Sequence, residues 1–327
     1  MPEHSPSFSE LADLASARVG GRTLAANDDF FAPRSNLVKA SAPIFIDGKY
    51  TTRGKWMDGW ESRRRRTPGH DWCIVALGFR GRIRGVDVNT RFFTGNFPTH
   101  CSLDAIDSAT VPPRPVHAVE GPPWTPILPQ TALEGDSHNF IAIADDRPWT
   151  HVRLNIFPDG GVARLRVYGD AEVDWRRLAK AGRPIDLAAI EHGGLAIDAS
   201  DTHYGTPNNM LMPGRAPNMG DGWETKRRRG PGYDWAIVRL GTPGIISRVE
   251  IDTNHYKGNY PDSASLEGLL ADGAWSELLP QTKLRPHHRH FFAKELRQAG
   301  LVSRVRLNIY PDGGVSRLRV YGRLAAD

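Results

Sequence analysis

The sequence predicts an all-β protein made of two antiparallel β-sandwiches, and three observations support this fold class. The stretch Asp58 to Trp72 recurs as Asp221 to Trp235, with 11 of 15 positions identical. Val152 to Gly169 matches Val305 to Gly322 at 16 of 18 positions. Short alternating apolar runs, separated by many of the 33 Gly and 25 Pro residues, are typical of strands joined by turns. The long period favours two domain-sized copies over a solenoid.

The chain is expected to divide into four parts. They are an N-terminal extension (1–28), a first sandwich (29–170), a linker (171–200) and a second sandwich (201–327). Within the extension, residues 9–15 could form a short helix that packs on the first domain, and residues 174–181 of the linker a second one before Gly182.

Within the first copy, residues 72–79 are apolar enough for a strand buried on both faces, and residues 83–89 alternate as a half-buried strand does. A loop closing on Gly-Asn-aromatic-Pro follows. Alternating residues 152–156 and 165–168 flank Pro158-Asp159-Gly160-Gly161, which predicts a hairpin. The first copy also has about ten extra residues around 44–54 and a proline-rich insertion at 112–123.

Composition narrows the possible functions. The net charge is +5 and the pI is about 9.3, but 37 acidic residues are interspersed with 42 basic ones. This favours a small anionic ligand over nucleic acid. Cys73 and Cys101 have alanine counterparts, so we expect a reducing compartment without disulfides. No signal peptide or membrane span is evident, and a cytoplasmic protein without membrane partners is expected.

The duplicated aromatic and acidic residues have both structural and functional interpretations. The tryptophans are interpreted as core residues; they are Trp60, Trp72, Trp223 and Trp235. Asp58 and Asp221 precede glycine and could form turns or act as acids. Glu61 and Glu224 stand just before the cationic runs, each with one residue between.

The runs Arg63 to Arg66 and Lys226 to Arg229 could be solvated loops. Acidic residues flank both runs, and a guanidinium group can hold a carboxylate through two parallel hydrogen bonds. We therefore favour a polar site to which the central arginines contribute. These arginines are Arg64, Arg65, Arg227 and Arg228.

Loop residues add further candidates. Asn96 and Asn259 could donate and accept hydrogen bonds. His70, His255 and Lys257 occur in one copy each, which indicates either specialisation of the two copies or drift in a loop. The run His287 to His290 lacks the spacing of a specific zinc site, so we predict no cofactor, with a divalent metal as the alternative.

The tandem unit with DGWE, an arginine run, LPQT and NI(F/Y)PDGG…RLRVYG resembles the allantoicase family from about residue 30 to 322. The resemblance implies two galactose-binding-like jelly rolls, hydrolysis of allantoate to ureidoglycolate and urea, and a homo-oligomer, a trimer or hexamer. It makes five of the residues above candidates for acid or base work, namely Asp58, Glu61, His70, Asp221 and Glu224. The other polar candidates would bind substrate, with His255 and Lys257 as second choices for acid or base work.

Two other classes of function compete with this interpretation. Sandwiches of this type also serve as carbohydrate-binding modules, because fold does not fix function. Against that alternative, both copies repeat a charged cluster rather than an exposed aromatic platform. A structural or nucleic-acid-binding protein is the third possibility, and only the pI favours it.

Overall fold

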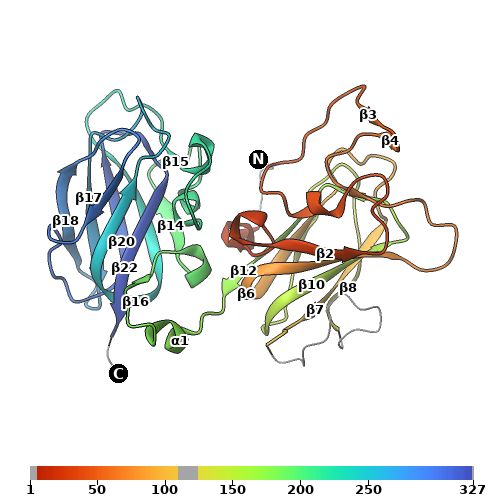
Figure 1. Ribbon diagram of the computed structural model, residues 1–327, viewed down its shortest axis with the longest axis horizontal. Helices are drawn as coiled ribbons and strands as arrows, with labels where there is room; N and C mark the ends of the chain where they lie inside the picture. The colour runs from red at the N-terminus through yellow and green to blue at the C-terminus, as the bar shows by residue number, and fades with distance from the viewer. Residues whose placement is uncertain (1–5, 110–123, 326–327) are drawn as a thin grey trace. The chain divides into compact units, whose positions relative to one another are not determined.

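The computed structural model describes residues 6–109 and 124–325 (Figure 1). The chain separates into two compact units, Met1–Glu172 and Val173–Asp327. Both are antiparallel β-structures, which confirms the predicted all-β class and the duplication. The proline-rich insertion at 112–123 lies outside the described residues.

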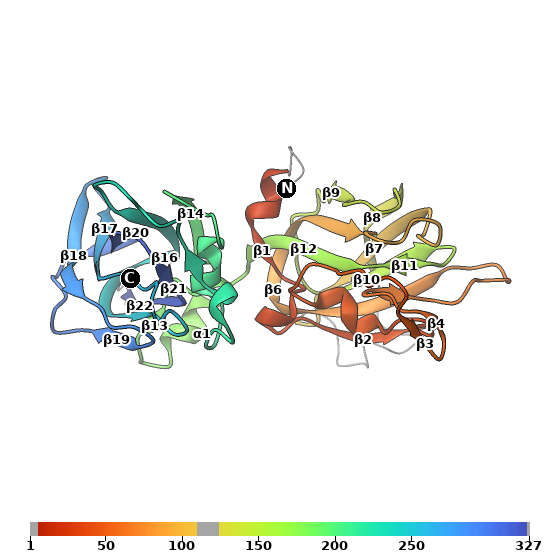
Figure 2. The same ribbon diagram turned by 90° about the horizontal axis from the view of Figure 1, so that it is seen from above.

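The first unit is built mainly from eight strands (Figure 2). They are β1 (Ala12–Asp13), β2 (Arg22–Ala26), β6 (Asp71–Asn89), β7 (His100–Ile106), β8 (Thr125–Ala132), β9 (Phe140–Ala142), β10 (Pro148–Phe157) and β12 (Arg164–Ala171). Two short pairs complete it. They are β5 (Trp60–Glu61) with β11 (Gly161–Val162), and the hairpin of β3 (Tyr50–Thr51) and β4 (Gly54–Lys55) inside the extra residues of this copy.

Strand β6 folds back on itself and joins two sheets. Its residues 71–76 pair with β10 and β2, whereas residues 81–89 pair with β12. Only residues 158–163 connect β10 to β12, so the neighbouring ends of these two strands lie at most about 25 Å apart. If β6 were straight, its 19 residues would extend about 60 Å and would hold those ends much farther apart. Both ends of β6 therefore lie at one end of the sandwich.

The predicted hairpin around Pro158 to Gly161 is wrong. Strands β10 and β12 do not pair with each other; β10 pairs with residues 71–76 and 81–82 of β6, and β12 with residues 81–89. The turn is an arch that carries the chain from one sheet to the other. Alternating side chains of β10 and β12 point inward on both sides of this arch, with Leu154 and Leu165 fully buried. The pattern therefore specifies two strands but not their partner.

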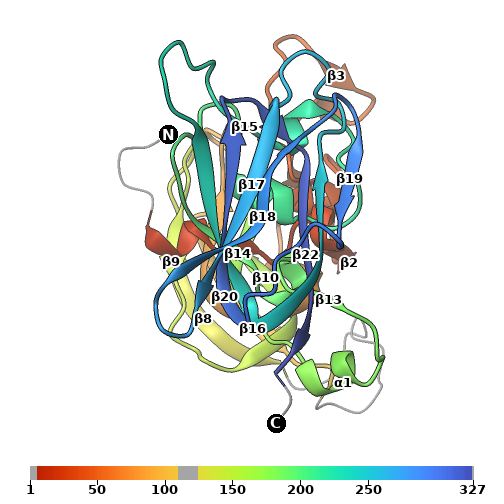
Figure 3. The same cartoon turned by 90° about the vertical axis from the view of Figure 1, so that its left-hand side faces the viewer.

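The second unit repeats this arrangement (Figure 3). Its main strands are β13 (Ile185–Asp186), β14 (Leu195–Ala199), β16 (Asp234–Asp252), β17 (Ser263–Leu270), β18 (Trp275–Lys283), β19 (Arg289–Phe292), β20 (Leu301–Tyr310) and β22 (Arg317–Leu324). Its short pair is β15 (Trp223–Glu224) with β21 (Gly314–Val315). The linker helix is α1 (Trp175–Ala179), whose first turn is capped by the Asp174 carboxylate.

The helix expected at 9–15 is absent. A 3₁₀ turn, Ser7–Glu10, leads directly into β1. The Asp13 carboxylate accepts hydrogen bonds from the backbone N–H groups of Ala15 and Val167, at 3.1 and 3.0 Å, and so fixes the chain against β12. This tertiary contact prevails over the weak local helix propensity.

The duplicated tryptophans differ in burial. Trp60 and Trp223 are fully buried core residues, and each indole N–H donates to a backbone carbonyl at 2.8 Å. Trp72 and Trp235 are only half-buried, because they stand on the outward side of their strands. The core interpretation therefore holds for the first pair only.

Candidate active site

The duplicated polar residues gather at one end of each unit. This end receives both termini of β6 or β16, the loop after each of these strands, and the arch between β10 and β12 or between β20 and β22. Its geometry follows from the fold-back of the long strand. Loops held at such an end by a rigid sandwich are a usual place for a functional site.

A buried ion pair forms the base of this end in each unit. Arg164, which is fully buried, donates to Asp58 Oδ2 at 2.6 Å, to the Asp58 carbonyl at 2.7 Å and to the Ser41 carbonyl at 2.9 Å. Lys39 Nζ lies 2.9 Å from the other Asp58 oxygen. In the second unit Arg317 holds Asp221 in the same way, at 2.6 Å.

These contacts make Asp58 an ionised structural anchor. Burial alone would raise its pKa, but hydrogen bonds from Arg164 and Lys39 and the charge of Arg164 lower the pKa below its ordinary value. Sequence reasoning missed Arg164 and Arg317. Both arginines begin the duplicated RLRVYG segment, but nothing in that segment shows which acidic residue each of them pairs with.

Above the ion pair, each unit has a carboxyl–amide pair. Asn96 Nδ2 donates to Glu61 Oε1 at 2.6 Å. Pairing of β5 with β11 sets Glu61 opposite Gly161, whose N–H donates to the Asn96 carbonyl at 2.8 Å. Glu61 and Asn96 were both candidates from sequence, and the fold brings them into contact across 35 residues of chain.

The second unit has the equivalent pair, in which Asn259 Nδ2 donates to Glu224 Oε1. In the first unit, burial raises the pKa of Glu61, and the hydrogen bond from Asn96 only partly opposes this. A carboxyl group of this kind is suited to hold and release a proton.

We expect Glu61→Gln to make the pH dependence of unfolding differ from that of the wild type. A carboxyl with a raised folded-state pKa stabilises the fold below its unfolded pKa, and this contribution is lost as pH rises through the folded-state value. Glutamine removes the charge and keeps an acceptor for Asn96. The variant should therefore gain stability relative to wild type as pH rises above about 4, the ordinary pKa of a glutamate. Urea unfolding at several pH values measures this, and a difference independent of pH would contradict it.

The arginine runs divide into structural and exposed members. Arg65 pairs with Asp71 at 2.7 Å, and its backbone N–H donates to Asp159 at 2.8 Å. Arg228 repeats both contacts with Asp234 and Asp312. These two arginines hold the arch to the start of the long strand. Arg64 and Arg227 are exposed beside them and remain candidates for substrate binding.

The single-copy candidates lie around the same ends. The His70 ring packs on Phe157 with centroids 4.7 Å apart, as Tyr233 does on Tyr310 at 4.9 Å. This is a packing position shared with a tyrosine, so it gives no specific support for acid or base work. Lys257 is exposed.

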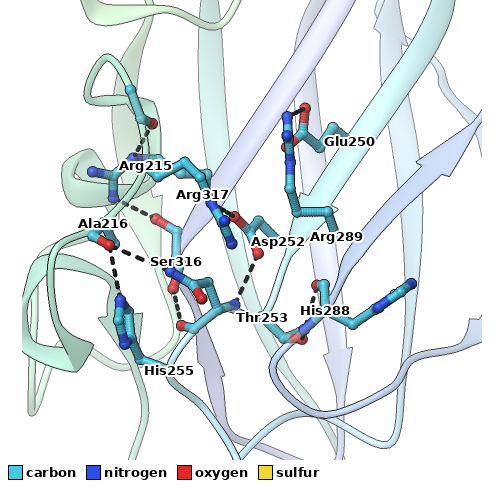
Figure 4. Close-up of polar contacts among 12 residues, drawn as sticks. Arg215, Ala216, Glu250, Asp252, Thr253, His255, His288, Arg289, Ser316 and Arg317 are labelled. Atoms are coloured by element: carbon cyan, nitrogen blue, oxygen red, sulfur yellow. Dashed lines mark hydrogen bonds and ion pairs between the residues drawn. The ribbon is translucent and has the colours of Figure 1, made fainter.

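His255 belongs to a polar cluster of the second unit, with its Nε2 2.8 Å from the Ala216 carbonyl (Figure 4). The same cluster contains an ion pair that sequence reasoning did not identify. Arg215 Nε lies 3.8 Å from Asp252 Oδ2, and Asp252 is buried.

The histidine run does not form a metal site. His287 Nδ1 accepts from the His255 N–H at 2.8 Å, and His290 Nε2 accepts from the Arg285 N–H at 2.8 Å. Within residues 6–109 and 124–325, no group of three His, Cys, Asp or Glu side chains is arranged to hold a metal ion. In the same residues, no helix is both long and apolar enough to cross a membrane.

The fold and the site define a class, namely tandem β-sandwich proteins in which each sandwich has a buried ion pair beneath a carboxyl–amide pair. The chain belongs to the allantoicase family, whose repeat matches residues 12–172 and 185–325. As a member of this family it is an enzyme, a hydrolase. The jelly-roll fold expected from the resemblance is thus confirmed.

Relatives and solved structures agree with this assignment. A probable allantoicase of Pseudomonas paraeruginosa is 50% identical over 332 residues, covering 98% of each chain. A probable allantoicase of Burkholderia mallei is 48% identical over 338 residues, covering 98% of this chain and 97% of the relative. The crystal structure of allantoicase from Saccharomyces cerevisiae is 33% identical, with a TM-score of 0.81, and the match covers 96% of this chain and 94% of that one.

Proposed function

We propose that this enzyme hydrolyses allantoate to ureidoglycolate and urea in allantoin degradation. The full-length match to the allantoicase repeats carries the proposal. The duplicated carboxyl–amide pair supplies residues suited to the reaction. Allantoate has a carboxylate and two ureido groups on one carbon. Hydrolysis breaks one bond from this carbon to a ureido nitrogen and forms a bond to the oxygen of water.

Acid–base chemistry by the paired glutamates accounts for this step. The acid protonates the departing ureido nitrogen, and a base takes a proton from the attacking water. We assign both roles within a unit to its own glutamate, Glu61 or Glu224: the carboxyl first gives its proton to the departing nitrogen, and the resulting carboxylate then takes the proton from water. The raised pKa of Glu61 supports its action as an acid. An imine-like intermediate at the central carbon would be stabilised by nearby carboxylate charge.

The amides and free guanidiniums would orient the substrate. Asn96 keeps a carbonyl oxygen and a second N–H, groups that match a ureido function. Asn259 keeps a carbonyl oxygen, while its amide nitrogen also contacts Met219 Sδ at 3.4 Å. Arg64 and Arg227 are exposed cations at the same end. Asp58 and Asp221, which the sequence also suggested as acids, are better suited to hold the loops that carry the glutamates, because buried arginines occupy them.

The assembly and location of the enzyme are also proposals. A homo-oligomer, a trimer or hexamer, is expected from the family resemblance, and light scattering on the purified protein would test it. Cys73 and Cys101 are both free and buried, which is compatible with work in the reducing cytoplasm.

The reaction is tested by incubating the purified protein with allantoate and measuring urea and ureidoglycolate. Equal amounts of the two products are expected. Binding of a sugar without release of urea would instead favour a carbohydrate-binding module. The same assay after chelation tests whether a divalent metal takes part.

A further inference from the structure

We propose that Arg215 binds the substrate carboxylate and that Asp252 positions its guanidinium, so that the second unit holds the complete substrate site. This inference rests on the proposed function, since it concerns recognition of the same substrate. It singles out one of two otherwise similar units. Arg215 lies outside the duplicated segments, and Asp252 lies in one of them at a position where the first copy has an asparagine.

At the positions of Arg215 and Asp252, the first unit has two neutral residues. Arg164 donates through Nε to the Ser41 carbonyl, and Arg317 donates through Nε to the Gly214 carbonyl, so Ala42 is the counterpart of Arg215. In the strand registers, Arg164 stands opposite Asn89. Arg317 stands opposite Asp252. The first unit therefore has a neutral pair, Ala42 and Asn89, where the second has a cation and an anion.

Asp252 is not satisfied within the described structure. It is 1% exposed; its Oδ1 accepts from the Asn254 N–H at 2.8 Å, while its buried Oδ2 has no hydrogen bond among the described residues. Among the described residues, Oδ2 forms an ion pair with Arg215, whose Nε lies 3.8 Å away. A buried carboxylate oxygen without a donor is costly. The equivalent Asn89 has a partner for each polar side-chain atom, because its oxygen accepts from the Arg91 N–H at 2.9 Å and its Nδ2 lies 3.3 Å from His138 Nδ1.

Arg215 is free to bind an anion. Its side chain is 58% exposed, and within the described residues it makes no hydrogen bond, only the long contact to Asp252 (Figure 4). A guanidinium steered from one side by a buried carboxylate can present its remaining N–H groups to a carboxylate ligand. An arginine whose N–H groups were all bonded within the protein could not bind a carboxylate ligand in this way.

The surroundings of the two sites agree with this difference. In the first unit, Phe92 stacks on Phe45 with ring centroids 5.8 Å apart. The counterpart of Phe92 is His255, whose ring contacts the carbonyl of Ala216, the neighbour of Arg215. The second unit thus has polar groups beside the exposed guanidinium where the first unit has a stacked aromatic pair.

Three variants of the full-length enzyme test the inference: Arg215→Ala, Asp252→Asn, and the two combined. We expect Arg215→Ala to raise both KM and the calorimetric Kd for allantoate roughly 10- to 100-fold, the usual cost of losing a hydrogen bond between charged groups. The kcat should stay within a few-fold. Methylenediurea, which is allantoate without its carboxylate, should inhibit wild type and variant equally.

The combined variant supplies the control for folding and for coupling. It recreates the neutral pair with which the first unit already folds, so its urea-unfolding midpoint should remain close to that of wild type. If Asp252 acts through Arg215, Asp252→Asn should weaken allantoate binding in the wild-type background but not in the Arg215→Ala background. Arg248→Ala removes an exposed arginine that lies over Tyr321 and should leave KM unchanged.

The outcomes separate this inference from the proposed function. Urea release with an unchanged KM and Kd in Arg215→Ala would overturn the inference and leave the function standing. Tight allantoate binding by wild type without urea release, lost in Arg215→Ala, would support the inference and overturn the function. Equal weakening of allantoate and methylenediurea binding would also overturn the inference, since the carboxylate would then not be the group recognised.

Discussion

Replacing Glu224 with glutamine is expected to lower kcat for allantoate by roughly 10²- to 10⁴-fold, the range typical of a lost general acid or base. Glutamine keeps the size of the side chain and an oxygen that can accept from Asn259, but it cannot transfer the proton. The Kd for allantoate should change little, because the amide still occupies the same position. Steady-state urea release together with calorimetric binding measures both quantities.

Glu61→Gln is the matched variant in the other unit. If the second unit holds the complete site, this substitution should affect kcat much less than Glu224→Gln does. A large loss in Glu61→Gln with normal turnover in Glu224→Gln would move the chemistry to the first unit, overturning the proposed role of Arg215 while leaving the function intact. Near-normal turnover in both variants would reject the acid–base assignment itself.

Replacing Arg164 with methionine is expected to destabilise the first unit by about 3–5 kcal/mol. The reason is that Asp58 would remain buried with its main cationic partner gone, and the carbonyls of Asp58 and Ser41 would lose their donor. Urea unfolding of the full chain, followed by a probe in the first unit, measures this loss. Arg317→Met should have a similar effect on the second unit.

Two further variants test whether that loss of stability comes from leaving the buried Asp58 charge unpaired. Arg63→Met breaks an ion pair with Asp28 whose arginine is 62% exposed, and it should cost at most about 1 kcal/mol. Combining Arg164→Met with Asp58→Asn removes both charges and should recover part of the stability. If Arg164→Met costs no more than Arg63→Met, Asp58 is not a structural anchor and returns as a candidate for proton transfer.

Much of the architecture could be predicted from local patterns. Alternation in β10 and β12 and the turn residues between them indicated strands correctly. Their true partner could not be predicted, because an arch between sheets and a hairpin use similar turn residues. The fold-back of β6 decides between them, and it depends on pairing between residues far apart in the chain.

The site was predictable to the extent that its residues lie in duplicated segments. Glu61 and Asn96 were found in this way, and the fold brings them together. The Arg164 partner of Asp58 lies 106 residues away, and Arg215 has an alanine as its counterpart. Long-range ion pairs and features present in only one copy leave no local signal in a single sequence.

Strands within residues 1–28 and 171–200, the expected extension and linker, were also not predictable from the sequence. Their composition resembles that of connecting chain, but β1 and β2 add to the sheets of the first unit, and β13 and β14 do so in the second. Short edge strands of this kind carry little alternation. The contacts of their carboxylates, such as that of Asp186 with the Val320 N–H at 3.0 Å, fix them instead.

The most direct measurement is urea release by the variant that combines Glu61→Gln and Glu224→Gln, at saturating allantoate and with binding checked by calorimetry. Allantoate should still bind with a Kd near that of wild type, while kcat falls at least about 100-fold. Turnover within tenfold of wild type in the folded double variant would contradict the claim that the carboxyl–amide pairs carry the hydrolysis.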